Sequence, residues 1–375
     1  MVGRIEFDMG GLKRIIFTVT NDLTYDQRMQ KICSSLCKAG YAVELVGRER
    51  DFSVPLKAEP FEQTRLKCIF NHGKLFYLEY NIRLLIYLTF SQFDAACAID
   101  LDTIAPVCMI GKLKGAKLVY DAHEYFTEVP EVIRRPKIQK VWQWVEKTFL
   151  PKFDLVYTVS EGLAELFHQK YGKQVFVIMN VPSKQNAVVG TVQKQEKFIL
   201  YQGALNEGRG LEFLIEAMQQ IDGSLKLAGE GDLSNELRAL VKKLKLENKV
   251  SFLGYVQPAD LKQITANAYL GVNLVENKGL SYYYSLSNKF FDYIQASVPQ
   301  VCIDFPEYKK LNDKYHVAVL TKDCSLNAIS VALTRLLYDE NLYKELQKNC
   351  EVCSRELNWE VEELKLVKHY GQLLG

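Results

Sequence analysis

Short apolar runs alternate with amphipathic segments along the first half of the chain. Runs of this kind predict buried parallel strands, and the segments between them predict the helices that cover the sheet. The predicted strands are residues 13–19, 41–46, 65–70, 95–99, 116–120, 155–159 and 175–178. The helices between them include residues 25–39 and 160–171, the second of which opens at Ser160 as an N-cap. This half therefore predicts a parallel sheet with helices on both faces.

The second half starts the same pattern again. The predicted strands are residues 198–202, 224–227, 250–253, 270–274, 300–303 and 317–320. The predicted helices are residues 210–219, 233–244, 258–266, 289–296, 326–338 and 341–354. Residues 181–196 are polar and without periodicity, which is typical of a linker. We expect two doubly wound α/β domains, with ligands beyond the carboxyl ends of the strands and the reaction in the cleft between the domains.

Composition narrows the class of protein. The chain has 375 residues, long for one core, and its 47 basic and 45 acidic residues give a net charge of +2. This balance argues against a nucleic-acid partner. Nine scattered cysteines have no zinc-finger spacing and indicate buried reduced thiols, and no secretory signal is apparent. We therefore expect a cytoplasmic protein.

Residues 75–90 form the most apolar segment of the chain. They are fewer than the ~20 residues that cross a bilayer, and Glu79 and Arg83 interrupt them. A core helix is expected. A helix lying on a membrane surface is the alternative, which would give the protein a peripheral position at the inner face of the cell membrane.

Glycine-rich turns and basic residues gather in residues 197–299. Glycine lets the backbone approach a ligand closely, and a helix N-terminus favours an anion. Arg209 stands between two glycines, and Lys289 opens the helix predicted at residues 289–296. This chemistry suits a diphosphate and predicts a nucleotide-linked substrate.

Several motifs together resemble those of the retaining glycosyltransferases of family 4, the group 1 glycosyl transferases. They are YDAHE at 120–124, TVSEGL at 158–163, NVP at 180–182, YQGALNEGRGLEFLIEAM at 201–218, LAGEGD at 227–232 and SNKFFDYI at 287–294. The resemblance implies the GT-B fold, with two Rossmann-like domains: residues 1–182 on the acceptor side and 183–358 on the nucleotide-sugar side. A final helix, residues 359–375, is expected to return to the first domain. The family needs neither metal nor cofactor, so Asp100 and Asp102 are interpreted as a polar loop pair, although they spell D-x-D.

The resemblance also assigns donor-binding residues. Arg209 matches the basic residue that holds the donor diphosphate. Many relatives carry a second arginine after the strand's glycine, where this chain has Ala204, and Lys289 is the expected replacement. Asp292 matches the last carboxylate of the E-x7-E motif, whose first glutamate is replaced by Tyr284. The remaining expected donor-binding residues are Gly203, Gly229, Gly231, Gly254, Tyr255, Val256, Ser287 and Asn288. A solvated helix residue is the structural alternative for Arg209, Lys289 and Asp292.

The first domain offers a second set of candidates. His123 follows a predicted strand, and the resemblance assigns it to the donor sugar or phosphate as a catalytic group beside Arg209 and Lys289. Asp121 and Glu124 would raise its proton affinity if close, and a histidine that fixes a loop is the alternative. Weaker candidates for acceptor or sugar contacts are Asn21, Asp22, Asp26, Arg28 and Glu124. For Asp22 and Asp26, helix capping is an equal alternative.

The predicted activity is a retaining hexosyltransferase that moves a sugar from a UDP- or GDP-linked donor to a saccharide or lipid-linked acceptor. The setting would be surface polysaccharide or glycolipid synthesis. Two alternatives stay open: a nucleotide-sugar epimerase or hydrolase with the same plan, and an inactive glycosyltransferase-like subunit. The missing first glutamate and the Gly203–Ala204 sequence favour the second.

Overall fold

The computed structural model describes residues 11–24, 26–51, 53–184 and 197–375. Tyr25 of the first predicted helix and residues 185–196 of the predicted linker lie outside the described residues. The chain divides into two compact units. Unit 1 runs to Met179 and includes Glu362–Gly375, and unit 2 is Asn180–Val361.

Unit 1 is built on a seven-stranded parallel sheet in the order β3-β2-β1-β4-β5-β6-β7. The strands are β1 (Arg14–Thr18), β2 (Ala42–Glu49), β3 (Glu62–Lys67), β4 (Ala95–Ile99), β5 (Lys117–Ala122), β6 (Leu155–Thr158) and β7 (Phe176–Val177). The helices are α1 (Gln27–Lys38), α2 (Gly73–Phe90), α3 (Ile104–Lys114), α4 (Pro130–Ile133), α5 (Pro136–Phe149) and α6 (Glu161–Tyr171), together with α15 (Trp359–Leu374) from Glu362 onward.

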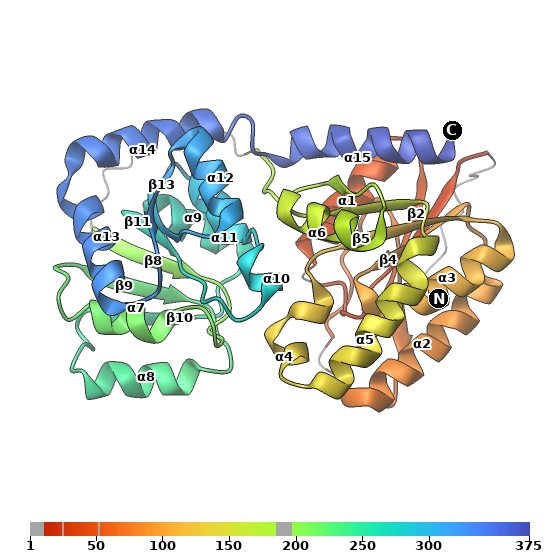
Figure 1. The fold of residues 1–375 in the computed structure, drawn as a ribbon, viewed down its shortest axis with the longest axis horizontal. Helices are drawn as coiled ribbons and strands as arrows, with labels where there is room; N and C mark the ends of the chain where they lie inside the picture. The colour runs from red at the N-terminus through yellow and green to blue at the C-terminus, as the bar shows by residue number, and fades with distance from the viewer. Residues whose placement is uncertain (1–10, 25, 52, 185–196) are drawn as a thin grey trace. The chain divides into compact units, whose positions relative to one another are not determined.

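Helices cover both faces of this sheet (Figure 1). On one face, Tyr370 of α15 packs its ring 6.1 Å from that of Phe17, and Lys38 of α1 pairs with Glu363 of α15. On the other face, α3 contacts both α2 and α5. The core-helix prediction for residues 75–90 is only half right, because α2 buries Phe76, Tyr80, Leu84 and Leu88 but exposes an apolar stripe on its opposite side.

Unit 2 is built on a six-stranded parallel sheet in the order β10-β9-β8-β11-β12-β13. The strands are β8 (Phe198–Gln202), β9 (Ser224–Ala228), β10 (Val250–Gly254), β11 (Leu270–Asn273), β12 (Gln300–Ile303) and β13 (Ala318–Thr321). The helices are α7 (Leu211–Ala217), α8 (Ser234–Lys243), α9 (Pro258–Asn267), α10 (Leu280–Tyr283), α11 (Asn288–Gln295), α12 (Pro306–Tyr315), α13 (Leu326–Tyr338) and α14 (Glu340–Cys353). The predicted α/β class with two doubly wound parallel sheets is confirmed.

Each sheet has one point at which the strand order reverses, between β1 and β4 in unit 1 and between β8 and β11 in unit 2. At such a switch point, connections leave the neighbouring strands in opposite directions and open a crevice at the carboxyl ends. Both sets of candidate residues follow strands at or beside these points. Within the described residues, no helix is both long and apolar enough to span a bilayer.

Candidate active site

Two glycine turns meet at the switch point of unit 2. Gly203 follows β8 with φ +127°, and Gly229 follows β9 with φ +150°. A Cβ atom added to Gly229 would lie 2.0 Å from the carbonyl oxygen of Gly203, closer than any side chain allows. Glycine is therefore required at Gly229, and the two turns form one continuous strip of backbone.

Lys289 places its ammonium group against this strip. A Cβ on Gly203 would lie 3.7 Å from Lys289 Nζ, and the ammonium lies 4.3 Å from the centre of the Tyr201 ring. The residue is buried, and no described residue forms a hydrogen bond or an ion pair with its ammonium. Burial, together with the nearby positive charge of Arg209, lowers the pKa of Lys289 to about 7.

Arg209 is the second cation of this site. Its guanidinium lies 4.6 Å above the Tyr282 ring, and no carboxylate of the described residues pairs with it. Gly208 and Gly210 flank it with φ values of +81° and +63°, and the tyrosine ring leaves no room for a side chain at Gly208. Two cations thus lie near one another beside exposed backbone, each supported by an aromatic ring. An anion is the partner that this arrangement lacks.

A hydrogen-bonded chain orients Asp292. Gln202, the last residue of β8, donates from Nε2 to Asp292 Oδ2 at 2.8 Å. The hydroxyl of Thr265 lies 2.7 Å from both Gln202 Oε1 and the carbonyl oxygen of Leu261, and its one proton is shared between these two acceptors. Gln202 and Thr265 are both buried, so this chain fixes one oxygen of the carboxylate. Gln202 was not among the residues predicted from the sequence. The one sequence feature that marks it is a polar residue at the end of an apolar strand.

The other predicted donor residues surround these groups. A Cβ on Gly231 would lie 2.2 Å from Asn206 Oδ1, and Gly254 accepts a hydrogen bond from the Gly229 amide. Ser287 donates to Asn273 of β11, and Asn288 accepts from Asn180. Tyr284, at the position of the missing glutamate, packs its ring edge-on against Tyr283. Tyr255 is exposed, whereas Val256 packs against the apolar core, so its side chain is committed to packing.

In unit 1, a buried ion pair forms the centre of the switch-point cluster. Arg28 donates from Nη2 to Asp121 Oδ1 at 3.0 Å, from Nε to Asp121 Oδ2 at 3.3 Å, and from Nη1 to the carbonyl oxygen of Ile178. Burial disfavours ionisation of Asp121, but Arg28 and His123 outweigh it and hold the pKa of Asp121 below its usual value. The guanidinium is thus held by groups of its own unit, and a substrate contact by Arg28 stays a prediction.

His123 completes this cluster. Its Nε2 lies 3.1 Å from Asp121 Oδ2, and its backbone amide donates to Asp100 Oδ1 at 2.9 Å. Burial opposes the charged ring, but Asp121 and Asp100 outweigh it and raise the pKa of His123 to about 9. Asp121 is thus a partner that the sequence suggested, Asp100 is a further one, and the ring is an imidazolium at neutral pH.

The D-x-D pair has separate roles. Asp100, at φ +53°, holds the His123 backbone, and burial raises its pKa well above the usual value. Asp102 accepts from the Thr20 hydroxyl at 2.5 Å, and burial raises its pKa to about 6. Among the described residues, no group of three or more His, Cys, Asp or Glu side chains has the geometry of a metal site.

The weaker candidates after β1 form hydrogen bonds that hold the loop between β1 and α1. Asp26 caps α1 by accepting from the Met29 amide, and Asn21 donates to it at 2.6 Å. Asp22 accepts from the Thr24 amide and from Ser53. Glu124 is half-buried beside His123. The capping alternative therefore describes Asp26, while any substrate contact by these residues remains a prediction.

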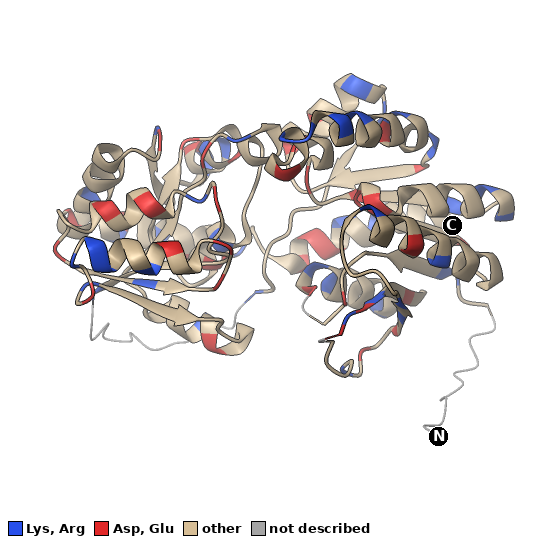
Figure 2. Cartoon of the chain, turned by 90° about the horizontal axis from the view of Figure 1, so that it is seen from below, with Lys and Arg blue, Asp and Glu red and all other residues tan. Residues whose placement is uncertain are grey.

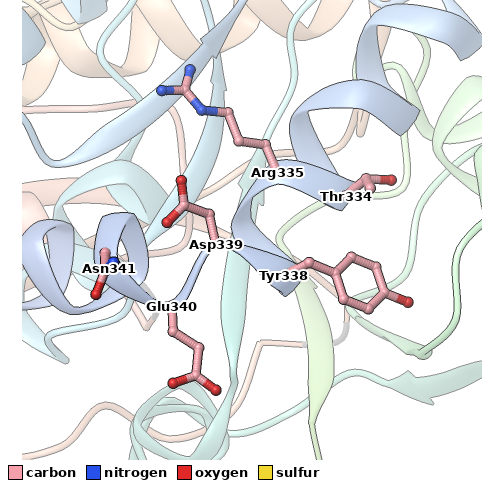
Figure 3. A pocket seen from close by; sticks show the side chains of 6 residues that line it. All are labelled: Thr334, Arg335, Tyr338, Asp339, Glu340 and Asn341. Carbon is pink, nitrogen blue, oxygen red and sulfur yellow. The ribbon is translucent and has the colours of Figure 1, made fainter.

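A hollow of about 670 Å³ lies apart from both clusters, at the junction of α13 and α14 (Figure 3). The side chains that line it point in different directions and do not converge on one point. They are Thr334, Arg335, Tyr338, Asp339, Glu340 and Asn341. None of the sequence candidates lines it.

Family models match both halves of the chain. Residues 25–180 match the glycosyl transferase 4-like domain, and residues 183–351 match the glycosyl transferases group 1. The chain belongs to the group 1 glycosyltransferases. The two matches confirm the family resemblance that the sequence motifs indicated. They follow one another along the glycosyltransferase in the same order as its two units.

Solved structures with the same fold cover nearly the whole glycosyltransferase. A sucrose-phosphate synthase from Thermosynechococcus elongatus has a TM-score of 0.78 at 18 % identity, covering 96 % of this chain and 99 % of that chain. The Anabaena protein HepE in complex with UDP-glucose has a TM-score of 0.77 at 14 % identity, covering 96 % of this chain and 100 % of that chain. At these identities the likeness establishes the GT-B fold.

A curated relative from Campylobacter jejuni is 28 % identical over 203 residues, 52 % of this chain and 53 % of that protein. It is the N-acetylgalactosamine-N,N'-diacetylbacillosaminyl-diphospho-undecaprenol 4-alpha-N-acetylgalactosaminyltransferase. A glycosyltransferase from Methanocaldococcus jannaschii is 40 % identical over 81 residues, 20 % of this chain and 21 % of that protein. The matches thus span about half of the first relative and about a fifth of the second.

Proposed function

We propose that this glycosyltransferase transfers a sugar from a nucleotide-diphosphate sugar to an acceptor hydroxyl with retention of the anomeric configuration. The observation that carries the proposal is the pair of cations in unit 2, Arg209 and Lys289, neither of which has an anionic partner among the described residues. Isolated charges in a partly buried site are costly unless something neutralises them. A diphosphate would bring the missing negative charge.

The glycine strip and the carboxylate extend this assignment to a whole nucleotide. Gly203 and Gly229 let backbone amides approach the phosphate oxygens, which side chains at these positions would prevent. Asp292 is held by Gln202, and its carboxylate is suited to accept hydrogen bonds from ribose hydroxyls. HepE, which shares the fold, has been solved with UDP and with UDP-glucose, and this supports a uridine donor over a guanosine one.

The reaction breaks the bond between the sugar's anomeric carbon and the diphosphate oxygen, and the electron pair leaves with the oxygen. A new bond forms from the acceptor oxygen to the anomeric carbon, and the acceptor proton passes to the departing diphosphate. Arg209 and Lys289 would stabilise the negative charge that grows on the diphosphate, an effect worth roughly 3 kcal/mol for one well-placed donor. The proposal needs no metal ion or further cofactor.

In unit 1, His123 is the group that we assign to the sugar or the acceptor. As an imidazolium it can donate a hydrogen bond from Nδ1, which lies 4.0 Å from Asp100 Oδ2 and beyond hydrogen-bond distance of it, while Nε2 stays with Asp121. The Campylobacter relative acts on an undecaprenol-linked saccharide, as its name states. This supports a lipid-linked saccharide acceptor and a place in surface polysaccharide or glycolipid synthesis.

Calorimetric titration with UDP and GDP tests the donor site. We expect UDP to bind and Arg209→Ala to weaken binding by about 10- to 100-fold, because a charge-assisted hydrogen bond is lost. Arg238→Ala is the matched control, since Arg238 also stacks on an aromatic ring in unit 2 but pairs with Glu230. Equal affinities for Arg209→Ala and the wild type would refute the assignment, and UDP-sugar breakdown without an acceptor would favour a hydrolase.

A further inference from the structure

The outward side of α2 carries an uninterrupted apolar stripe. Its members are spaced three or four residues apart and lie opposite the buried stripe of the same helix: Leu75, Leu78, Ile82, Ile86 and Phe90. Phe90 is 85 % exposed and Leu78 is 60 % exposed. A helix that is apolar all round is normally enclosed on all sides, but among the described residues nothing covers this stripe.

The neighbouring helices extend the stripe into a surface. Met109 and Leu113 are exposed on α3, and Val141 and Trp144 are exposed on α5. Because α3 contacts both α2 and α5, the three helices that carry these exposed residues lie side by side on the same face of the sheet (Figure 1). We call this surface, made by the exposed residues of α2, α3 and α5, the three-helix face. Soluble proteins rarely expose a contiguous apolar area of this kind without a binding role.

An open hollow continues this apolar surface at the beginning of α2. It has a volume of about 540 Å³ and is lined by Ile69, Phe70, Asn71, His72, Lys74 and Leu75. Ile69 and Phe70 are exposed there, and Leu75 belongs to both the hollow and the stripe.

The charges on the three-helix face have one sign. All seven exposed charged residues of these helices are basic: Lys74, Arg83, Lys112, Lys114, Lys137, Lys140 and Lys147. The two acidic residues are already paired, Glu79 with Arg83 and Glu146 with Lys170. Over the whole chain, basic and acidic residues are nearly equal in number and interspersed, so this set is a local feature (Figure 2).

We propose that unit 1 docks with its three-helix face on a bilayer that contains anionic lipids. The apolar stripes would enter the boundary between headgroups and acyl chains, and lysine and arginine would extend toward the lipid phosphates. Trp144 has the ring that favours this boundary. A second copy of the chain fits less well, because a two-fold interface would set the basic residues of one copy against those of the other. The proposal does not depend on the donor or on the acceptor.

Vesicle flotation of the full chain tests the proposal, with pure phosphatidylcholine vesicles and with vesicles that contain about 30 % phosphatidylglycerol. We expect binding to the anionic vesicles to be at least about ten-fold tighter, and to weaken when salt rises from about 0.1 M to about 0.5 M. Trp144 fluorescence should shift to shorter wavelength on binding, which Trp144→Phe would abolish.

Two pairs of variants locate the surface. Leu78→Glu should weaken binding about ten-fold, whereas Val331→Glu, also at a 60 % exposed position but in unit 2, should change it less than about two-fold. Lys140→Glu should also weaken vesicle binding about ten-fold. Its control, Lys243→Glu on α8 of unit 2, should change binding less than about two-fold. These positions are exposed, so each variant should keep the wild-type melting temperature.

Three results would overturn the proposal. One is no binding to the anionic vesicles, and another is an equal loss of binding in the unit 2 controls. The third is a dimer, seen by light scattering, that Leu78→Glu dissociates, because the three-helix face would then be a protein interface.

Discussion

At the switch point of unit 1, Arg28 and His123 are both paired with carboxylates, whereas in unit 2 Arg209 and Lys289 lie over tyrosine rings with no carboxylate partner among the described residues. The two sheets have the same kind of crevice, but the charges of the first are balanced within the unit. In the second, burial and then the positive charge of Arg209 lower the pKa of Lys289, and Asp292 offsets this only in part. We therefore expect the charged residues of this cluster in unit 1 to stabilise the fold, and the two cations of unit 2 to bind a ligand.

The largest effect should follow from breaking the buried pair in unit 1. Arg28→Met removes the two guanidinium hydrogen bonds of the buried Asp121 and leaves His123 as its remaining charged partner, so we expect the free energy of unfolding to fall by about 3–5 kcal/mol. Arg238→Met breaks the exposed pair with Glu230 and should cost less than about 1 kcal/mol. Urea denaturation of both variants measures the difference. A similar cost for both would mean that burial does not distinguish the two ion pairs.

The second prediction concerns His123 and pH. A histidine whose folded pKa is about 9 and whose unfolded pKa is 6.5 stabilises the fold fully below pH 6.5, and this contribution is lost as pH rises through 9. We expect His123→Gln to remove at most roughly 3 kcal/mol at about pH 6 and almost nothing above about pH 10.

Lys289 titrates in the same range with the opposite sign, because its neutral form is favoured in the fold. The measurement is therefore the difference in free energy of unfolding between His123→Gln and the wild type across pH. A difference that does not change with pH would show that the His123 imidazolium is not stabilised by Asp121 and Asp100.

The sequence predicted the parallel sheets well, because their strands are continuous apolar runs and both faces are covered. The edge strand β3 was misplaced three residues too late, at 65–70 instead of Glu62–Lys67. The strand was predicted there because Ile69 and Phe70 are apolar. Both are exposed in the structure, and the strand contains the polar Thr64 and Arg65. Thr64 donates to Glu44 and Arg65 to Asp22, so tertiary hydrogen bonds outweigh strand propensity there.

The resemblance to the family motifs suggested Lys289 as the replacement for the cation that is missing after Gly203. The structure places Lys289 beside Gly203, although the two are 86 positions apart in the sequence. The pairing of Arg28 with Asp121, 93 positions apart, leaves no local pattern, and only the order of the strands creates it. The same holds for Gln202 and Asp292, since the partner of a buried amide is decided by packing.

The third prediction concerns Lys289 and is intermediate in size. Lys289→Met should weaken UDP binding by about 10- to 100-fold while leaving stability unchanged or higher, since a buried, repelled charge is removed. Binding to the wild type should also take up nearly one proton at about pH 8, because the diphosphate restores the charged form, and almost none at about pH 6. Titrations in two buffers of different ionisation enthalpy measure this uptake. Uptake that persists in Lys289→Met would assign the proton to another group.

The smallest effect should come from the chain that orients Asp292. Thr265→Val removes the hydroxyl that donates to Gln202 while keeping the shape of the side chain, so Gln202 loses one fixed partner and Asp292 gains freedom. We expect UDP affinity to fall about three- to five-fold, roughly 1 kcal/mol, and affinity for inorganic diphosphate, which has no ribose, to stay the same. Calorimetric titration with UDP and with inorganic diphosphate shows whether the loss of affinity is specific to the ligand that has a ribose. A parallel loss for diphosphate would show that Asp292 acts on the phosphate side, and the division of unit 2 into a cationic phosphate site and a carboxylate ribose site would have to be abandoned.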